Sequence, residues 1–333
     1  MWEATVHVER EQLVDAVPEK VWELVSSPAA LSVFPGWFAF GVPGAVEGTD
    51  RLCCVLVSGQ GSFRCPAAGT RRVRCVIVDV REEIPGQQIR WQVRNTEPAG
   101  RQVFTLSMHP QAGRSAVRIA FSDVVPRASK VDRQTYWRRQ VKTWLDGLQA
   151  AAEGRAPWPQ AVMPAAMQRA MAAPAPLRDP MEASAAVVID GAPGAVWEAA
   201  WDPASARLID PERIAWSGHV PGTPPREAGE MRYSVHRHPG ERFTGSVFIV
   251  TELADGHRVV ARHIGHAHEN VRIITPVPGG TRLELTARWS AREVRGHANA
   301  REVPERMSAE LRRRAEGYQA LIEGPRGRAV DGM

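Results

Sequence analysis

The chain contains one phrase twice, and this repeat decides the fold. Residues 14–23 read VDAVPEKVWE and residues 189–198 read IDGAPGAVWE, so the second copy follows the first by 175 residues. Ser27-Pro28-Ala29 is matched by Asp-Pro-Ala at the same offset. The two halves also end alike, at residues 152–154 and 322–324. Units of roughly 145 residues are much longer than solenoid repeats, so we interpret the pattern as the tandem duplication of a whole domain.

Length and composition agree with this interpretation. For 333 residues, two domains of about 150 residues are the usual expectation. The hydrophobic fraction of 44% and the charged fraction of 24% are typical of a globular protein. The repeat and the proline pattern predict a first domain over residues 1–154, a Pro/Ala-rich linker over 155–181 and a second domain over 182–325.

Each half predicts the same order of elements. A strand comes first, and a helix follows that begins at Pro18 or at Pro193, since proline is tolerated at the first helical position. About six short strands come next, with apolar and polar residues alternating, as in antiparallel sheets that have one buried face. A long amphipathic helix closes each half. Its apolar stripe is Trp137, Val141, Trp144, Leu145 and Leu148 in the first half, and Met307, Leu311, Ala315, Tyr318, Leu321 and Ile322 in the second.

Several functional classes are disfavoured by composition. No apolar run reaches the roughly 18 residues of a membrane span, and the N-terminus lacks a secretory signal, so we expect a cytoplasmic protein without membrane insertion. The net charge of +5 is spread among interspersed acids and bases, which argues against nucleic acid as a partner. Cys53, Cys54, Cys65 and Cys75 lack paired zinc-ligand spacing, so we expect buried thiols and no metal.

The phrases Pro18-x-x-Val21-Trp22 and Pro193-x-x-Val196-Trp197, together with the closing helices, resemble the START-like, or SRPBCC, helix-grip superfamily. That superfamily includes polyketide cyclases and aromatases. The resemblance covers both halves and implies an α+β fold of two tandem helix-grip domains. In each, a curved antiparallel sheet wraps around the long C-terminal helix and leaves an internal cavity. Two such domains in one chain resemble the didomain aromatase/cyclases of bacterial type II polyketide pathways.

The resemblance implies a cyclase/aromatase, a lyase- or isomerase-type enzyme of antibiotic biosynthesis. It would bind an apolar poly-ketone in the cavity and promote aldol cyclisation and dehydration. The partner would be a hydrophobic small molecule or a carrier-bound polyketide, the latter implying an acyl carrier protein. The sequence lacks phosphate-binding and dinucleotide-binding motifs, so we expect no cofactor. Two alternatives stay open: a non-catalytic carrier or sensor of a hydrophobic molecule, and a protein-interaction module.

The second half holds most of the candidate catalytic residues. Six of the ten histidines lie between residues 236 and 268, and imidazole exchanges protons near neutral pH. His263 is the first catalytic candidate, since it is in phase with Val259 and Ala261, although Val260 supports the opposite phase equally well. Tyr233 alternates inward with Met231 and Val235, so its hydroxyl could donate to a ligand carbonyl or to another strand. The same phase points His236 outward unless a bulge intervenes. Surface histidines are the alternative for the whole group.

The first half offers further candidates. Asp123 continues the inward phase of Phe121 and is a candidate acid or base, although an exposed carboxylate at the strand end is the alternative. Residues 34–40 form the densest aromatic segment, and we expect a loop there that acts as a lid or as an interface between the halves. The ring of Trp91 either forms an aromatic wall for a ligand or packs in the core. The predicted ligand-binding residues are Trp37, Phe38, Arg64, Trp91, Phe121, His236 and Trp289.

Overall fold

The computed structural model describes residues 3–34, 36–47, 50–57, 74–94, 102–159, 163, 177–240, 242–291 and 302–324. The chain divides into two compact units. Unit 1 comprises Met1–Pro164 with Arg237–Gly245, and unit 2 comprises Ala165–His236 with Ser246–Met333. Most of the predicted linker lies outside the described residues, and the predicted boundaries at 154 and 182 stay a prediction.

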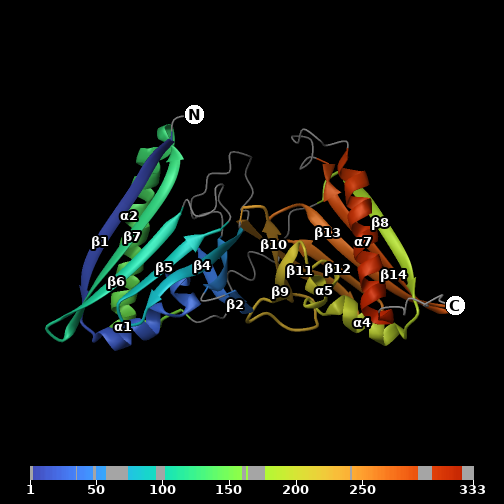
Figure 1. Cartoon of the computed structure of the whole chain (residues 1–333), viewed down its shortest axis with the longest axis horizontal. Helices are drawn as coiled ribbons and strands as arrows, with labels where there is room; N and C mark the ends of the chain where they lie inside the picture. The colour runs from blue at the N-terminus through green and yellow to red at the C-terminus, as the bar shows by residue number, and fades with distance from the viewer. Residues whose placement is uncertain are drawn as a thin grey trace, which may run out of the picture. The chain divides into compact units, whose positions relative to one another are not determined.

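Unit 1 is an antiparallel sheet with one long helix packed on it (Figure 1). The strands follow the order β1-β7-β6-β5-β4-β3-β2. Its elements are β1 (Glu3–Val14), α1 (Pro18–Val25), η1 (Pro28–Val33), β2 (Trp37–Glu47), β3 (Asp50–Val57), β4 (Arg74–Ile84), β5 (Gln88–Val93), β6 (Val103–Gln111), β7 (Arg114–Pro126), η2 (Arg127–Ser129) and α2 (Lys130–Ala152).

Unit 2 repeats this order. Its strands run β8-β14-β13-β12-β11-β10-β9, and helix α7 packs against β8 and β14. Its elements are β8 (Pro180–Ile189), α4 (Pro193–Trp201), α5 (Ser205–Ile209), β9 (Ile214–His219), β10 (Met231–His238), β11 (Arg242–Ala254), β12 (Arg258–His263), β13 (His268–Val277), β14 (Gly280–Ser290) and α7 (Val303–Glu323). The predicted α+β class, a curved antiparallel sheet gripping a C-terminal helix in each half, is confirmed.

Identical local contacts appear in both units. The hydroxyl of Ser115 donates to the carbonyl of Ala16 at 2.8 Å, and the hydroxyl of Thr281 donates to the carbonyl of Gly191 at 2.7 Å. The two donors occupy the same place opposite the first strand of their unit, because Ser115 pairs with Val14 and Thr281 with Ile189. The two units therefore share an equivalent hydrogen bond, as expected if one domain was duplicated.

The closing helices contact the first strands in the same manner. Glu153 of unit 1 accepts the backbone N–H of Asp15 at 3.4 Å, and Glu323 of unit 2 accepts the backbone N–H of Asp190 at 2.9 Å. A β-bulge also recurs, at Arg81 in β4 and at Thr251 in β11. These matches relate the residues of the two units one by one, so the two interiors can be compared position by position.

The helical stripes were predicted well, with one error. In α2, all five predicted residues are completely buried. In α7, Leu311, Ala315 and Tyr318 are buried, and Ile322 packs against the core, but Leu321 is 37% exposed. Leu321 lies in the last turn of α7, two residues before the helix ends at Glu323. None of the helices in the described ranges is both long and apolar enough to cross a membrane.

The loop predicted over residues 34–40 is absent, because β2 begins at Trp37. The side chains from Trp37 to Phe40 are all buried, and Phe34 contacts Trp37 with a ring-centroid distance of 4.9 Å. A strand that is paired with β3 and buried on both faces cannot swing as a lid. The predicted lid at this segment is therefore wrong.

Candidate functional site

The interior of unit 2 contains a cavity of about 460 Å³ between α7 and the curved sheet. This volume lies in the range of sites that take small organic ligands. Most of the lining side chains come from alternate residues of β10 to β14 and from one face of α7. Among them are Arg232, Tyr233, Ser234, His236, Phe248, Val259, Ala261, His263, His266, His268, Asn270, Arg272, Trp289, Met307, Glu310 and Arg314.

The correspondence between the units explains why this cavity exists. Ser115 corresponds to Thr281, so Phe121, six residues further along β7, corresponds to Ala287 in β14. The matched ends of the closing helices make Met307 the counterpart of Trp137. In unit 1 the rings of Phe121 and Trp137 stack with centroids 3.8 Å apart. Unit 2 has a methyl group and a thioether at the same two positions.

Strand pairing extends this comparison to two more positions. Phe121 pairs with Phe104, and Ala287 pairs with Asn270. Phe104 in turn pairs with Trp91, and Asn270 with Ala261. The four aromatic residues of unit 1 are thus replaced in unit 2 by smaller side chains: Trp91 by Ala261, Phe104 by Asn270, Phe121 by Ala287 and Trp137 by Met307.

These four aromatic residues form a packed layer in unit 1. Phe104 lies 4.8 Å from Phe121 and 5.3 Å from Trp137 between ring centroids, and all four side chains are at most 2% exposed. Interiors pack to a density that leaves few voids, so removing such rings leaves space unless neighbours collapse into it. Ala261, Asn270 and Met307 all line the cavity. We conclude that ring-to-small exchanges created it.

One end of the cavity is lined by four imidazoles, His236, His263, His266 and His268, which we call the imidazole end. The rings of His263 and His266 have centroids 4.7 Å apart. Phe248 meets His263 edge-on at 5.0 Å and His268 at 5.7 Å. Aromatic edges and faces thus hold the imidazole rings in place.

The protonation state of His263 follows from its surroundings. Its Nδ1 accepts the backbone N–H of Gly265 at 2.9 Å, so the ring proton is assigned to Nε2. Burial, together with the neighbouring His266, His268 and His236, lowers the pKa of His263 to about 3. At neutral pH this imidazole is therefore an uncharged hydrogen-bond donor and a poor base.

Trp289 supplies a second donor at this end. Its side chain is 5% exposed and lines the cavity. Its indole Nε1 is buried without a hydrogen-bond partner among the described residues. Because a buried N–H without a partner is costly, this group is suited to an acceptor that belongs to a guest molecule.

The opposite end of the cavity holds two arginines, Arg232 and Arg272, and we call it the guanidinium end. Arg232 is 9% exposed, its Nε donates to Glu230 at 2.7 Å, and its guanidinium lies 3.9 Å above the ring of Trp201. Arg272 donates to the carbonyl of Ala200. Four residues separate Arg272 from His268 along β13, so the two ends lie about 13 Å apart.

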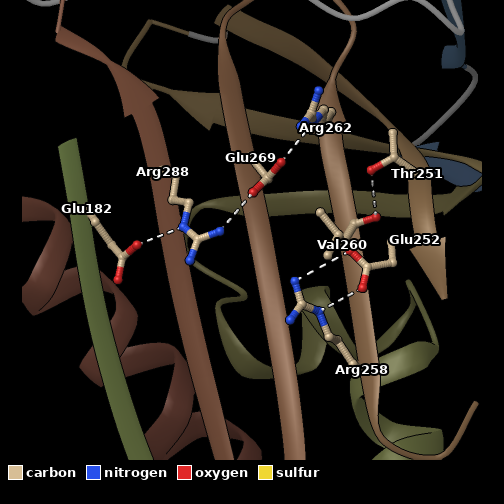
Figure 2. Close-up of polar contacts among 8 residues, drawn as sticks. All are labelled: Glu182, Thr251, Glu252, Arg258, Val260, Arg262, Glu269 and Arg288. Carbon is tan, nitrogen blue, oxygen red and sulfur yellow. Dashed lines mark hydrogen bonds and ion pairs between the residues drawn. The ribbon is translucent and has the colours of Figure 1, made fainter. Parts of the chain in front are cut away.

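An ion-pair ladder fixes the strands from the outer face of the sheet (Figure 2). Arg288 of β14 bonds Glu182 of β8 at 2.7 Å and Glu269 of β13 at 3.4 Å, and Glu269 also accepts from Arg262 of β12 at 2.7 Å. Glu269 lies between His268 and Asn270, which face the cavity, because neighbours in a strand point to opposite faces. The ladder therefore positions the lining residues without occupying the cavity.

Four of the predicted site residues, Tyr233, His236, His263 and Trp289, border this cavity. Arg232, Ser234 and His236 border it together with Tyr233, and the register of β10 shifts between Val235 and His236, at the bulge that the sequence-based prediction allowed for. Both faces of β10 are at least partly buried up to His236, so alternation could not identify the inner one. The ring of Tyr233 lies against Gly218 of β9, whose added β-carbon would meet the hydroxyl oxygen at 2.8 Å. A catalytic role for Tyr233 stays a prediction.

The candidates of unit 1 lie in a different environment. Trp37, Trp91 and Phe121 belong to the packed hydrophobic core, and Phe38 is buried beside Phe40 at 5.7 Å. Asp123 is 3% exposed and accepts from the amide of Gln102 at 3.1 Å, so the alternative of an exposed carboxylate is wrong. Arg64 lies outside the described residues. The ligand-binding and catalytic roles of these residues stay predictions.

Sequence reasoning missed Arg232, Arg272 and Asn270. The duplication could have revealed two of them. When the halves are aligned, the polar residues Asn270 and Arg272 occupy the positions of Phe104 and Leu106 in unit 1. Polar residues at core positions of a repeat indicate a site in one copy.

The cysteines and the acidic and imidazole side chains do not assemble into a metal centre in the described part of the chain. Within those ranges, no group of three or more His, Cys, Asp or Glu side chains could hold a metal ion. Cys53 and Cys54 are buried in β3 and form no disulfide, and burial together with Cys75 raises the pKa of Cys54 well above its ordinary value. Such a thiol is inert, in line with a packing role.

Residues 5–153 match the protein family described as polyketide cyclase / dehydrase and lipid transport. The matched range runs from β1 to the end of α2. Unit 1 is therefore similar to this family over less than half of the chain. Unit 2 has the same element order but lies outside the matched range, so the polyketide cyclase/dehydrase family match and the cavity fall in different units. No curated protein matches the sequence.

Several solved structures are similar to the chain. The di-domain ARO/CYC StfQ from the steffimycin biosynthetic pathway is 14% identical, with 95% of this chain and 98% of that chain covered and a TM-score of 0.35. The di-domain ARO/CYC BexL from the BE-7585A biosynthetic pathway is 16% identical, with 97% of this chain and 99% of that chain covered and a TM-score of 0.35. TTHA0849 from Thermus thermophilus is 17% identical, with 45% of this chain and 98% of that chain covered and a TM-score of 0.32.

Proposed function

We propose that the chain is a cofactor-independent cyclase/aromatase-like protein whose unit 2 cavity binds a poly-ketone-type intermediate and promotes aldol ring closure and dehydration. The observation that carries the proposal is the exchange of four packed aromatic side chains for a cavity with polar donors at its imidazole end. The match of residues 5–153 to the polyketide cyclase / dehydrase and lipid transport family supports the same reaction class.

The proposed chemistry needs no external reagent. In an aldol closure, a carbon between two carbonyls loses a proton, and the resulting enolate carbon bonds to a second carbonyl carbon. The oxygen of that carbonyl takes up a proton, and loss of water then leaves a carbon–carbon double bond. The reaction therefore requires groups that stabilise negative charge on oxygen and a group that exchanges protons.

The donors at the imidazole end meet the first need. The Nε2–H of His263 and the Nε1–H of Trp289 would bond the oxygen on which negative charge develops. A neutral imidazole can serve in this way because it donates without first having to lose a positive charge. In the proposal His236 and His266, which border the same end, exchange the protons.

The curved sheet and α7 would meet a further requirement by holding a flexible chain folded. Ring closure is faster when the reacting carbons are held near one another, and a cavity that excludes water also limits unwanted condensations. The separation of about 13 Å between the two ends would fix the guest along one axis of the cavity.

The test is an assay with a poly-β-ketone bound to an acyl carrier protein, with and without the purified chain. The proposal expects a shift from spontaneous products to one cyclised aromatic product. Trp289→Phe should slow this reaction by about 10- to 100-fold, because it removes one donor and keeps the ring. Trp137→Phe, in the core of unit 1, is the matched control and should leave the rate unchanged, because the Nε1 of Trp137 is likewise buried without a partner among the described residues. An identical product profile with and without protein would reject the proposal.

A second candidate is a non-catalytic carrier or sensor of a hydrophobic molecule. It is favoured by one observation, the low pKa of His263, which removes the first catalytic candidate as a base at neutral pH. Native mass spectrometry separates the two candidates. A co-purified ligand that survives incubation unchanged supports the carrier, and its conversion supports the enzyme.

A further inference from the structure

The guanidinium end carries positive charge that the surrounding protein does not fully balance. Arg232 and Arg272 both line it, and Glu230 is the carboxylate that bonds Arg232. Glu230 also accepts from His219 at 2.7 Å and from the backbone N–H of Arg226 at 2.7 Å, so its charge is shared among three donors. Burial disfavours the charged form, but these partners hold the pKa of Glu230 at about 2, and it stays ionised.

The other charged groups around the cavity have partners of their own. Glu310 of α7 pairs with Arg314 of the same helix at 2.7 Å and with Arg213, in the loop before β9, at 3.1 Å. Asp202 is exposed, and its Oδ1 accepts the backbone N–H of Ala204 at 2.9 Å. Two guanidiniums therefore face one buried carboxylate at the guanidinium end, which leaves one positive charge over.

Arg232 also has a donor that is not used. Its Nη2 is buried and makes no hydrogen bond within the described part of the chain. The remainder of the guanidinium is fixed, because Nε bonds Glu230 and the plane lies on Trp201. Burial lowers the pKa of Arg232, the bond to Glu230 opposes this shift, and Arg272 adds to it. A fixed and partly desolvated guanidinium with a free donor is well suited to bind a carboxylate.

We infer that the guanidinium end binds a carboxylate, so that this cavity also takes a planar, apolar carboxylic acid, which has the ring system of a cyclised product and a free carboxylate. The inference rests on the proposed function, since it names the form of the ligand that the same cavity would take. The carboxylate would bond Nη2 of Arg232 beside Arg272, and the ring system would lie in the space that Ala261, Asn270 and Met307 leave.

The test compares 2-naphthoate with its methyl ester, which has the same rings without the negative charge, by isothermal titration calorimetry on the full chain. The inference predicts that the wild-type chain binds the acid at least about tenfold more tightly than the ester. Arg232→Met should abolish this preference while leaving the affinity for the ester within about twofold. Arg207→Met, at an exposed arginine that does not line the cavity, is the control for the change in net charge.

A second variant guards against misfolding. Arg232→Met leaves Glu230 buried with fewer donors, which could destabilise unit 2. The double variant Glu230→Gln/Arg232→Met removes both charges and should likewise bind acid and ester equally. Equal binding of acid and ester by the wild-type chain, no binding of either, or an acid preference that survives in the double variant would overturn the inference. None of these measurements requires turnover, so the cyclisation assay can fail or succeed independently.

Discussion

The interiors of the two units differ at four corresponding positions. In unit 1, Phe104, Phe121 and Trp137 contact one another and Trp91 pairs with Phe104, whereas unit 2 has smaller side chains at all four positions, and three of them, Ala261, Asn270 and Met307, border a cavity. The scaffold around them is unchanged, as the paired hydroxyl bonds of Ser115 and Thr281 show. The difference teaches that a duplicated domain can gain a binding site by losing side-chain volume at few positions, while its copy keeps a packed core.

The largest effect is expected from reversing the exchange. Ala287→Phe combined with Met307→Trp imports the stacked pair of unit 1 into unit 2, so the rings should occupy the cavity. We expect the affinity for 2-naphthoate to fall at least about 100-fold, because the guest and the rings compete for one volume. Calorimetry measures the affinity, and circular dichroism verifies folding.

Leu283→Val is the matched control for this variant. It also imports a residue of unit 1, since Val117 is the counterpart of Leu283, but Leu283 does not line the cavity. The Leu283→Val variant should bind 2-naphthoate with the affinity of the wild-type chain. Undiminished binding by the ring-filled double variant would contradict the idea that these positions open the cavity.

The converse change tests unit 1. Phe121→Ala removes a ring that stacks on Trp137, and its side chain is completely buried. We expect the free energy of unfolding of unit 1 to fall by about 3–5 kcal/mol, because a large side chain leaves a cavity behind. Denaturant titration followed by tryptophan fluorescence measures this loss. Affinity at unit 2 should be unaffected, and a parallel loss of affinity would show that the ligand uses unit 1.

A smaller effect concerns acid stability. His263 has a pKa near 3 in the folded chain against an ordinary value of 6.5, so only the unfolded chain takes up a proton between these values. The stability from this group is therefore complete above pH 6.5 and declines as the pH falls toward 3. The slope is at most about 1.4 kcal/mol per pH unit for one proton.

His263→Phe should remove this slope. The comparison is read from denaturant midpoints between pH 6.5 and 4.5, above the range in which Glu230 takes up a proton. A variant whose midpoints fall as steeply as those of the wild-type chain would show that His263 is protonated in the folded state.

The smallest effects should be equal in the two units. Ser115→Ala and Thr281→Val each remove a buried hydroxyl that bonds a carbonyl after the first strand. Each should lower the free energy of unfolding by about 1–2 kcal/mol, because the carbonyl loses its donor. Denaturant titration of both variants measures this. Strongly unequal losses would argue that the two scaffolds have diverged as far as the interiors.

The sequence predicted the duplication, the order of elements and the buried stripe of α2 because these depend on local period and on repeated phrases. It also proposed His263 and Trp289, which border the cavity, although the phase of β12 was ambiguous because Val259 and Val260 are both buried. It failed at β10 because both faces of that strand are at least partly buried and its register shifts between Val235 and His236. It failed at residues 37–40 because a dense aromatic segment can pack as a strand as well as extend as a loop. Arg232 was missed for the first of these reasons.

The most direct test is a crystal structure of the chain with bound 2-naphthoate. The account predicts that the rings lie between α7 and strands β12 to β14 of unit 2, with the carboxylate within hydrogen-bond distance of Arg232. A ligand among the aromatic residues of unit 1, or a unit 2 interior closed by its own side chains, would contradict it.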